Sequence, residues 1–226
     1  MKFLKSDGII DYSDSVYPSE LVVISEDYKT PSSWKRSTIF GYSIAKGSYT
    51  YCGQVFPILE NSFFSLPILT SIESVHFQVK GKVSLFVRHG FIGQTLFLGL
   101  AEQVGRLAYV DGCSDSLLVF PPRLGDASLN LLYLPEKTLQ TAHSHPTIRL
   151  GMVIDGHGVA QTQDAEYPLS PGDAFSIAEH EIHRFKTTDS FLRVVAFHPD
   201  GDFGPTDNNH TMINRSYFKR GLFGQE

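Results

Sequence analysis

The segment Ala142–Gly151 has the sequence AHSHPTIRLG, and the predicted fold is built around it. In a β-strand alternate side chains share one face, so His143 and His145 are expected to project to the same side. Two imidazoles on one side are what two ligands of a single metal ion require. A third ligand must then come from another part of the chain.

The segment Pro171–Ile177, with the sequence PGDAFSI, precedes a histidine that is suited to be this third ligand. Pro-Gly-Asp predicts a turn, and Ala174–Ile177 a short apolar strand. After a polar corner at residues 178–182, a further strand is expected to begin at His183. Neutral imidazole suits borderline divalent metals, and three histidines leave coordination positions open for water, oxygen or substrate.

These two segments resemble the two sequence motifs of the cupin superfamily, and the resemblance covers residues 128–199. The matching residues are His143, His145, Gly156, Pro171, Gly172, Asp173 and His183. The resemblance implies an all-β fold, a small antiparallel jelly-roll barrel with one divalent transition metal held by the three histidines. Iron is the metal we expect, with manganese, nickel, copper and zinc as alternatives.

Arg149 is the main departure from the motifs, because it stands where the family's first motif carries an acidic ligand. If the strand continues through Pro146, Arg149 points into the barrel, where we expect it to clamp a substrate carboxylate or enolate as a catalytic and substrate-binding residue. The alternative is that Arg149 turns to the barrel mouth and pairs with Glu179 or Glu181. Tyr133, on the preceding predicted strand, is a second expected substrate-binding residue.

Composition limits the partners of the chain. Its 226 residues, 42% of them hydrophobic, suffice for one large or two small domains. With 19 basic and 24 acidic residues and no basic run, the sequence argues against nucleic-acid binding. Cys52 and Cys113 are far apart and are expected to be free thiols. Because the N-terminus is charged and no long apolar run follows it, we predict a cytoplasmic protein without a membrane partner.

The first half of the chain is predicted to be β-rich as well. Short runs rich in β-branched and aromatic residues are separated by turns, which is typical of a sandwich or barrel. These runs are residues 38–44, 48–51, 54–59, 75–79, 83–88, 95–98 and 117–120. In the second half, strands are predicted at residues 129–134, 139–145, 149–154, 159–162, 174–177, 183–186 and 191–197.

An internal echo suggests two barrels. Residues 75–84 and 150–159 share the form of a strand, a glycine turn and a returning strand. We therefore predict a degenerate, metal-free barrel over residues 1–125 and a metal-bearing cupin barrel over residues 126–226. The alternative is one barrel with an N-terminal β extension. Residues 200–215 are acidic and turn-rich and are expected to fold back over the barrel.

The function expected from these features is that of a three-histidine non-haem iron dioxygenase, an oxidoreductase acting on a small anionic or enolisable molecule. One alternative is a cupin that binds or senses a small molecule without turnover. Another is a metal-assisted isomerase or lyase, for which Tyr133 and Glu181 are the available acid or base residues. The resemblance also implies pairing through edge strands, and hence a homodimer.

Overall fold

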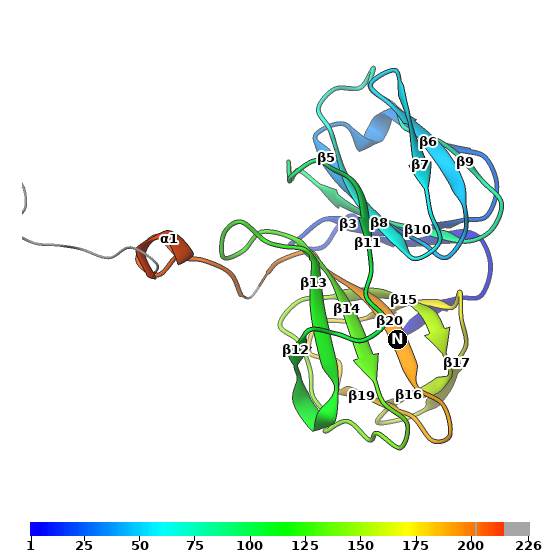
Figure 1. Cartoon of the computed structure of the whole chain (residues 1–226), viewed down its shortest axis with the longest axis vertical. Helices are drawn as coiled ribbons and strands as arrows, with labels where there is room; N and C mark the ends of the chain where they lie inside the picture. The colour runs from blue at the N-terminus through cyan, green and yellow to red at the C-terminus, as the bar shows by residue number, and fades with distance from the viewer. Residues whose placement is uncertain (202, 215–226) are drawn as a thin grey trace, which may run out of the picture.

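The structure is a computed structural model that describes residues 1–201 and 203–214. It is built almost entirely from antiparallel β-strands, which form two parts that lie against each other (Figure 1). The short helix α1 (Thr211–Asn214) lies away from both parts. The all-β class expected from the sequence is therefore confirmed.

The first part contains two sheets. A six-stranded sheet has the order β11-β8-β5-β10-β3-β2, and a four-stranded sheet has the order β4-β9-β6-β7. Their strands are β2 (Gly8–Tyr12), β3 (Ser19–Ile24), β4 (Tyr28–Lys29), β5 (Ser37–Ser43), β6 (Gly47–Tyr51), β7 (Gln54–Ile58), β8 (Ser62–Ile68), β9 (His76–Val79), β10 (Val83–His89) and β11 (Leu96–Leu100).

The second part is built in the same way. A seven-stranded sheet has the order β1-β18-β15-β20-β14-β13-β12, and a three-stranded sheet has the order β17-β16-β19. Their strands are β1 (Lys2–Leu4), β12 (Leu107–Ala108), β13 (Ser114–Val119), β14 (Ser128–Leu134), β15 (Arg149–Gly156), β16 (Gly158–Thr162), β17 (Glu166–Leu169), β18 (Ala174–Ile177), β19 (His183–Lys186) and β20 (Leu192–His198). Strands β1 and β13 precede residue 126 but pair with β18 and β14, which follow it, and β12 joins the same sheet by pairing with β13.

The strand order repeats between the two parts. The series β8-β5-β10-β3-β2 corresponds to β18-β15-β20-β14-β13, and β9-β6-β7 corresponds to β19-β16-β17. This correspondence corrects the echo seen in the sequence. Residues 75–84 cover β9 and the start of β10, which match β19 and β20, whereas residues 150–159 cover β15 and the start of β16. Glycine turns occur in many hairpins, so their likeness did not identify equivalent strands.

Buried hydrophobic side chains of the described residues gather in three places. One cluster joins the two sheets of the first part, a second joins the two sheets of the second part, and a third joins the six-stranded to the seven-stranded sheet. Strand β20 serves two of these clusters, because Val194 packs inside the second part while Val195 and Phe197 pack against the first. This confirms the expectation that the apolar run 191–197 is buried on both faces.

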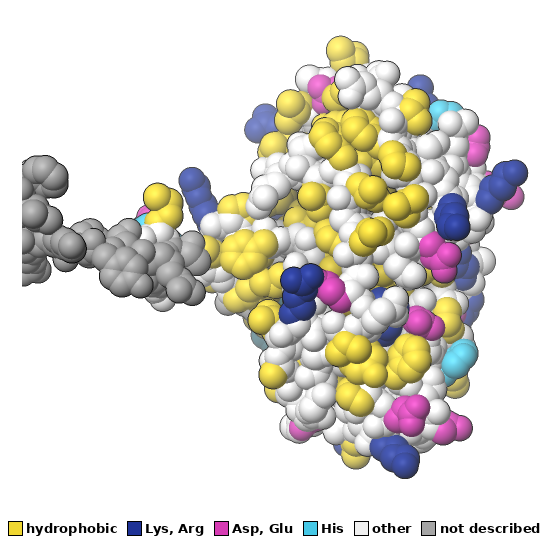
Figure 2. All heavy atoms as spheres, viewed as in Figure 1, with side chains coloured by type: hydrophobic (Ala, Val, Ile, Leu, Met, Phe, Trp, Pro, Cys, Tyr) yellow, Lys and Arg dark blue, Asp and Glu magenta, His cyan; other side chains and the backbone are white. Residues whose placement is uncertain are grey.

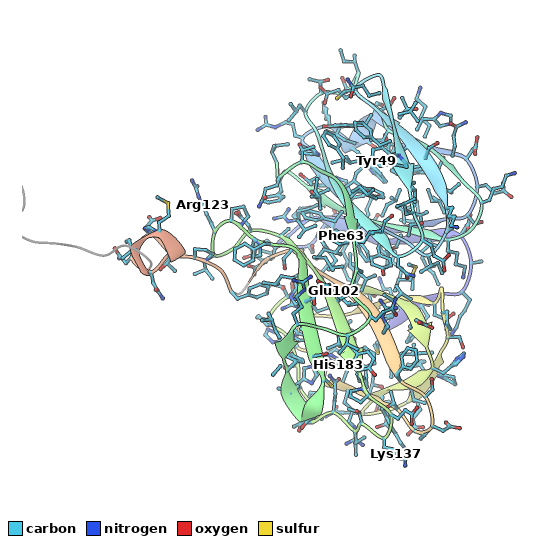
Figure 3. All side chains as sticks on the ribbon, in the orientation of Figure 1. Tyr49, Phe63, Glu102, Arg123, Lys137 and His183 are labelled. Carbon is cyan, nitrogen blue, oxygen red and sulfur yellow. The ribbon has the colours of Figure 1, made fainter. Side chains whose placement is uncertain are left out.

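The interior of the first part is filled by aromatic rings. Tyr49 lies 5.1 Å from Phe64 and 6.0 Å from Phe77, measured between ring centroids, and Trp34 is buried in the same cluster. Figure 3 labels Tyr49 among these packed side chains and His183 in the other part. The aromatic residues that suggested strands in the first half therefore form a solid core.

One row of paired residues crosses each large sheet in an equivalent way. In the first part it is Phe64, Gly41, Leu85 and Val22. In the second part it is Phe175, Gly151, Ala196 and Asn130. Both rows place a phenylalanine ring over a glycine, but the second row has smaller or polar side chains at its other two positions. Space inside the second part is the consequence.

We predict that Gly151→Ala lowers the free energy of unfolding by about 1–3 kcal/mol, because the new methyl group must displace the Phe175 ring. A Cβ atom at Gly151 would lie 2.5 Å from Cζ of Phe175. Chemical denaturation of the purified protein measures the change. The matched control is Gly41→Ala, whose Cβ atom would lie 2.0 Å from Cζ of Phe64. Both variants should be destabilised, and equal stability of Gly151→Ala and the wild type would contradict this account of the packing.

Candidate functional site

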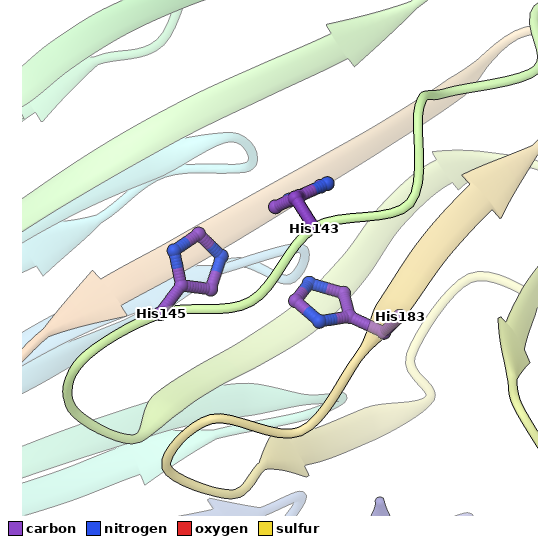
Figure 4. A group of neighbouring side chains, drawn as sticks. All are labelled: His143, His145 and His183. Carbon is purple, nitrogen blue, oxygen red and sulfur yellow. The ribbon is translucent and has the colours of Figure 1, made fainter.

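Three histidines of the second part lie close together (Figure 4). His143 and His183 exchange two backbone hydrogen bonds, of 3.0 Å and 2.9 Å between nitrogen and oxygen, which set their rings side by side with centroids 4.5 Å apart. His145, two residues along the extended chain, places its ring 5.1 Å from each of the other two. The sequence expectation that these three residues converge is met by the geometry.

The segment that carries His143 and His145 differs from the expected strand. Residues 139–145 form only isolated bridges, Leu139 with Lys186 and His143 with His183. The reason lies at Thr141, whose backbone N–H donates to the Asp111 carboxylate at 2.6 Å instead of to a neighbouring strand. The alternation of side chains persists without a continuous ladder, so the two histidines still share one side.

Backbone carbonyls orient two of the rings. Nδ1 of His143 lies 2.8 Å from the carbonyl oxygen of Thr141, and Nδ1 of His183 lies 2.9 Å from that of Glu181. A carbonyl only accepts, so each Nδ1 carries the proton and each Nε2 keeps its lone pair. The ligand atoms of the three histidines lie within 4.8 Å of one another. This arrangement can hold a metal ion through neutral imidazole nitrogens.

The surroundings keep two of these imidazoles uncharged. Burial, together with the positive charge of Arg149, lowers the pKa of His145 to about 3. Burial lowers the pKa of His183 to about 4, although the Glu181 carbonyl opposes the shift. Both rings are therefore neutral at neutral pH, the form that coordinates metals.

Arg149 lies at the start of β15 with 3% of its surface exposed, and it lines the same cavity as the histidines. Its Nη1 donates to the Thr147 hydroxyl at 2.5 Å and to the Ile148 carbonyl at 3.1 Å. Of the two orientations left open by the sequence, the inward one is observed. The Glu181 carboxylate accepts instead from the backbone N–H of Ala178 at 2.9 Å.

The cavity has a volume of about 370 Å³. Much of its wall is apolar and includes Leu117, Leu132, Phe175, Ile177, Phe185 and Val194. Its polar groups include the three histidines, Arg149, Asp115, Asn130 and His198. An apolar pocket with a few convergent polar groups is the usual form of a small-molecule site.

Tyr133 does not line this cavity. On β14 the alternate residues Asn130 and Leu132 face inward, so Tyr133 points to the opposite side, where its ring stacks on Phe191 at 5.9 Å. The structure thus does not bring Tyr133 together with the histidines. The interpretation from the sequence placed it on the correct strand without fixing which face that residue occupies.

Three cavity residues escaped the sequence analysis. Asp115 lies just before the predicted strand 117–120, Asn130 lies within the predicted strand 129–134, and His198 lies just after the predicted strand 191–197. A polar residue between apolar neighbours, as in Leu129-Asn130-Leu131, is the signal that marks an inward polar residue, but an outward one gives the same pattern.

Three other expectations concern the rest of the chain. Cys52 and Cys113 are free, as predicted. None of the described helices is long and apolar enough to cross a membrane. The segment after residue 200 was expected to fold back over the barrel, and Phe203 does line the cavity and contact His198, with ring centroids 5.9 Å apart. Residues 202 and 215–226 lie outside the described residues.

Comparison with known families and curated proteins gives one partial match. The model of the AraC-like ligand binding domain matches residues 135–204, the segment that contains all three histidines. A search of curated proteins finds no match.

Solved structures resemble the chain over most of its length. A putative glyoxylate induced protein from Pseudomonas aeruginosa has a TM-score of 0.63 at 12% identity, covering 88% of this chain and 81% of its own. A cupin 2 conserved barrel domain protein from Leptotrichia buccalis has a TM-score of 0.59 at 10% identity, covering 86% and 90%. A salicylate 1,2-dioxygenase variant from Pseudoaminobacter salicylatoxidans, in complex with gentisate, has a TM-score of 0.56 at 10% identity, covering 79% and 67%.

The fold and the site agree with these likenesses. Antiparallel sheets face each other around an interior that, in the second part, contains a histidine cluster and a cavity. The chain has the cupin fold.

Proposed function

We propose that the chain is a metal-dependent cupin in which His143, His145 and His183 hold one divalent transition metal beside a small-molecule pocket. The observation that carries this proposal is the convergence of three imidazoles, two of them fixed by carbonyls so that Nε2 is the ligand atom. Three nitrogen donors fit iron(II), manganese, nickel, copper or zinc, and iron is the metal we favour.

The charge of the site argues for an anionic substrate. Three neutral ligands leave the two positive charges of a divalent metal uncompensated, and the guanidinium of Arg149 lines the same cavity. A small acid or enolate that enters the pocket is attracted by all of them, and Arg149 is suited to neutralise its charge. We therefore assign Arg149 a role in binding and orienting the substrate.

We propose a dioxygenase-type oxidation as the reaction. Iron(II) held by His143, His145 and His183 would supply the chemistry with oxygen. The apolar walls exclude water from the reacting atoms, and the carbonyls of Thr141 and Glu181 hold the ligand rings in their orientation. Support comes from the likeness to a salicylate 1,2-dioxygenase complexed with gentisate, which is a small hydroxylated acid.

A ligand-binding cupin without turnover is the second candidate. The observation in its favour is the match of residues 135–204 to a ligand binding domain. A metal-assisted isomerase or lyase has less support, because neither Tyr133 nor Glu181 lines the cavity. Oxygen uptake by the iron-loaded protein with a panel of small hydroxy and keto acids separates the enzyme from the binding protein.

We also propose that the two parts are two cupin barrels, the first of which is degenerate. The supporting observation is the repeated strand order, which includes β1, β12 and β13 in the second barrel. Thr30 and Val75 form the backbone contact that corresponds to His143 with His183, so two ligand positions have no imidazole in the first barrel. Aromatic side chains occupy the interior there.

Location and assembly stay predictions. The cytoplasm is predicted from the N-terminal sequence alone. A homodimer through edge strands is supported by β11, an edge strand on which the apolar side chains of Phe97, Leu98 and Leu100 are exposed. Several groups of exposed hydrophobic side chains are visible on the surface in Figure 2.

The first prediction concerns metal content. Protein purified without a histidine tag is expected to hold about one transition metal per chain, and the double variant His143→Ala, His145→Ala to hold almost none. Elemental analysis measures this, and circular dichroism checks the fold. His157→Ala is the matched control, because this exposed histidine lies on a hairpin outside the cluster. A wild type that stays metal-free after reconstitution with iron, manganese or zinc would refute the metal site.

The second prediction concerns Asp111. Its carboxylate accepts from Thr141 N at 2.6 Å and from Thr141 Oγ1 at 3.1 Å, and it thereby holds the carbonyl that orients His143. Asp111→Ala should weaken metal binding by about 10-fold, as loss of a group that supports a ligand commonly does. Competition with a chromophoric chelator measures the affinity. Asp126→Ala, which removes an equivalent loop contact to Arg123 N, should leave it unchanged.

The third prediction concerns pH. In the metal-free protein the pKa values of about 3 and 4 at His145 and His183 mean that only the unfolded chain takes up protons there as the pH falls below 6.5. Asp115 has the opposite effect on stability, because its raised pKa of about 7 lets the folded state keep a proton that the unfolded state releases. Burial also lowers the pKa of His198, which adds to the histidine effect.

The histidines outnumber Asp115, so the free energy of unfolding should fall by about 2 kcal/mol between pH 6 and pH 5. Urea denaturation at each pH measures it. Saturating zinc should move this loss to lower pH, since the metal competes with protons. A metal-free protein that is equally stable at both pH values would contradict the burial of neutral histidines.

A further inference from the structure

Asp115 and Asn130 form a polar pair in the apolar wall of the cavity. They lie on the neighbouring strands β13 and β14, where Asn130 is paired with Leu117 and Asp115 with Leu132. The Asn130 amide donates from Nδ2 to Oδ1 of Asp115 at 3.2 Å. Both residues line the cavity that also contains the histidine cluster. The pair is therefore placed to contact whatever the cavity binds.

The pair leaves hydrogen-bonding capacity unused. Asn130 is buried, with 6% of the residue exposed, and its Oδ1 atom has no hydrogen-bond partner. Turning the amide over would set its oxygen against the Asp115 carboxyl group, which donates only when protonated, and would leave Nδ2 without a partner, so either orientation leaves a polar atom unsatisfied. Buried polar atoms normally have partners, and because Asn130 lines the cavity, its side chain is placed where a ligand can supply the missing group.

Asp115 has the same need. Within the described residues its carboxylate forms no ion pair and accepts the single hydrogen bond from Asn130. Burial without a cation raises the pKa of Asp115 to about 7. A hydrogen-bond donor supplied by a ligand would stabilise the ionised carboxylate.

The other part of the molecule shows what this position contains when the interior is solid. The residue equivalent to Asn130 in the row across the sheet is Val22, which is buried in the hydrophobic core. An apolar side chain is therefore compatible with the fold at this position, and the fold itself does not require the amide of Asn130. The amide is found only in the part that contains the cavity.

We propose that Asp115 and Asn130 form a subsite for a hydrogen-bond-donating substituent, a hydroxyl or an amino group, of the molecule bound in the cavity. The inference rests on the proposed function, in which the metal and Arg149 bind an acid group. Together the two sites select a small hydroxy or amino acid. Oxygen atoms of both side chains accept hydrogen bonds from the substituent. An acid that lacks the substituent leaves these acceptors unpaired and therefore binds more weakly.

Paired probes test the subsite on the full-length, iron-loaded protein under nitrogen. Isothermal titration compares benzoate with 2-hydroxybenzoate and 2-aminobenzoate, and propionate with lactate and alanine. In at least one set the substituted acid should bind about 10-fold more tightly than its parent. In Asn130→Leu and Asp115→Leu this ratio should fall to about one, while affinity for the unsubstituted parent is retained.

Two further variants separate hydrogen bonding from folding. Asp115→Asn keeps an acceptor of the same shape and should restore part of the preference, and Asp164→Asn, at an exposed position in the second part, should retain all of it. A preference that is unchanged in the leucine variants overturns the proposal, as does the absence of any preference, or of any binding, in the wild type. Metal analysis of the same samples distinguishes the failures: metal without preference refutes only the subsite, whereas absence of metal refutes the proposed function with it.

Discussion

The site depends on two backbone hydrogen bonds between His143 and His183. They lie between two further backbone hydrogen bonds, from Gln140 N–H to the Phe185 carbonyl at 3.0 Å and from His180 N–H to the His145 carbonyl at 2.8 Å, in a segment that forms isolated bridges and no ladder. A directly opposed pair in an antiparallel arrangement brings side chains on one face into contact, so residues forty positions apart become neighbours through their main chains. Carbonyls two residues earlier, at Thr141 and Glu181, then fix the rotation of each ring. Side-chain chemistry here follows from main-chain geometry.

Burial and charge act in the same direction around these rings. The protein keeps His145 and His183 neutral by enclosing them and by placing a guanidinium nearby. The same enclosure would make an unpaired divalent cation costly, so under the proposed function an occupant that brings negative charge is expected. An acid in the pocket would then bind the metal and Arg149 together. That requirement comes from the missing carboxylate ligand, which sets this chain apart from the motif that it resembles.

The sequence predicted the histidine cluster well because the signal is local. Two histidines at alternate positions share one side of an extended segment wherever that segment lies in the fold. The turn and short strand that precede His183 identify the third ligand from the sequence alone. Arg149 could be given two orientations, and only the tertiary structure chose between them. Asp115 and Asn130 were missed since their inward direction depends on pairing with distant strands, and a polar residue in a strand gives the same pattern whether it faces water or a cavity. The strand β8 (Ser62–Ile68) was missed for a related reason: burial on both faces removes alternation.

The rows that cross the two large sheets give the molecule an uneven interior. Leu85 and Val22 close the first part, while Ala196 and Asn130 open the second. A hollow core forfeits contacts that a filled one keeps, and such losses weaken a small domain. The seven-stranded sheet recovers part of this loss on its other face, where Phe197 packs against Phe40 at 5.2 Å and Phe86 at 5.6 Å. The first part contributes no residue to the lining of the cavity. Its packing against the seven-stranded sheet instead stabilises the second part and offsets the contacts that the cavity removes.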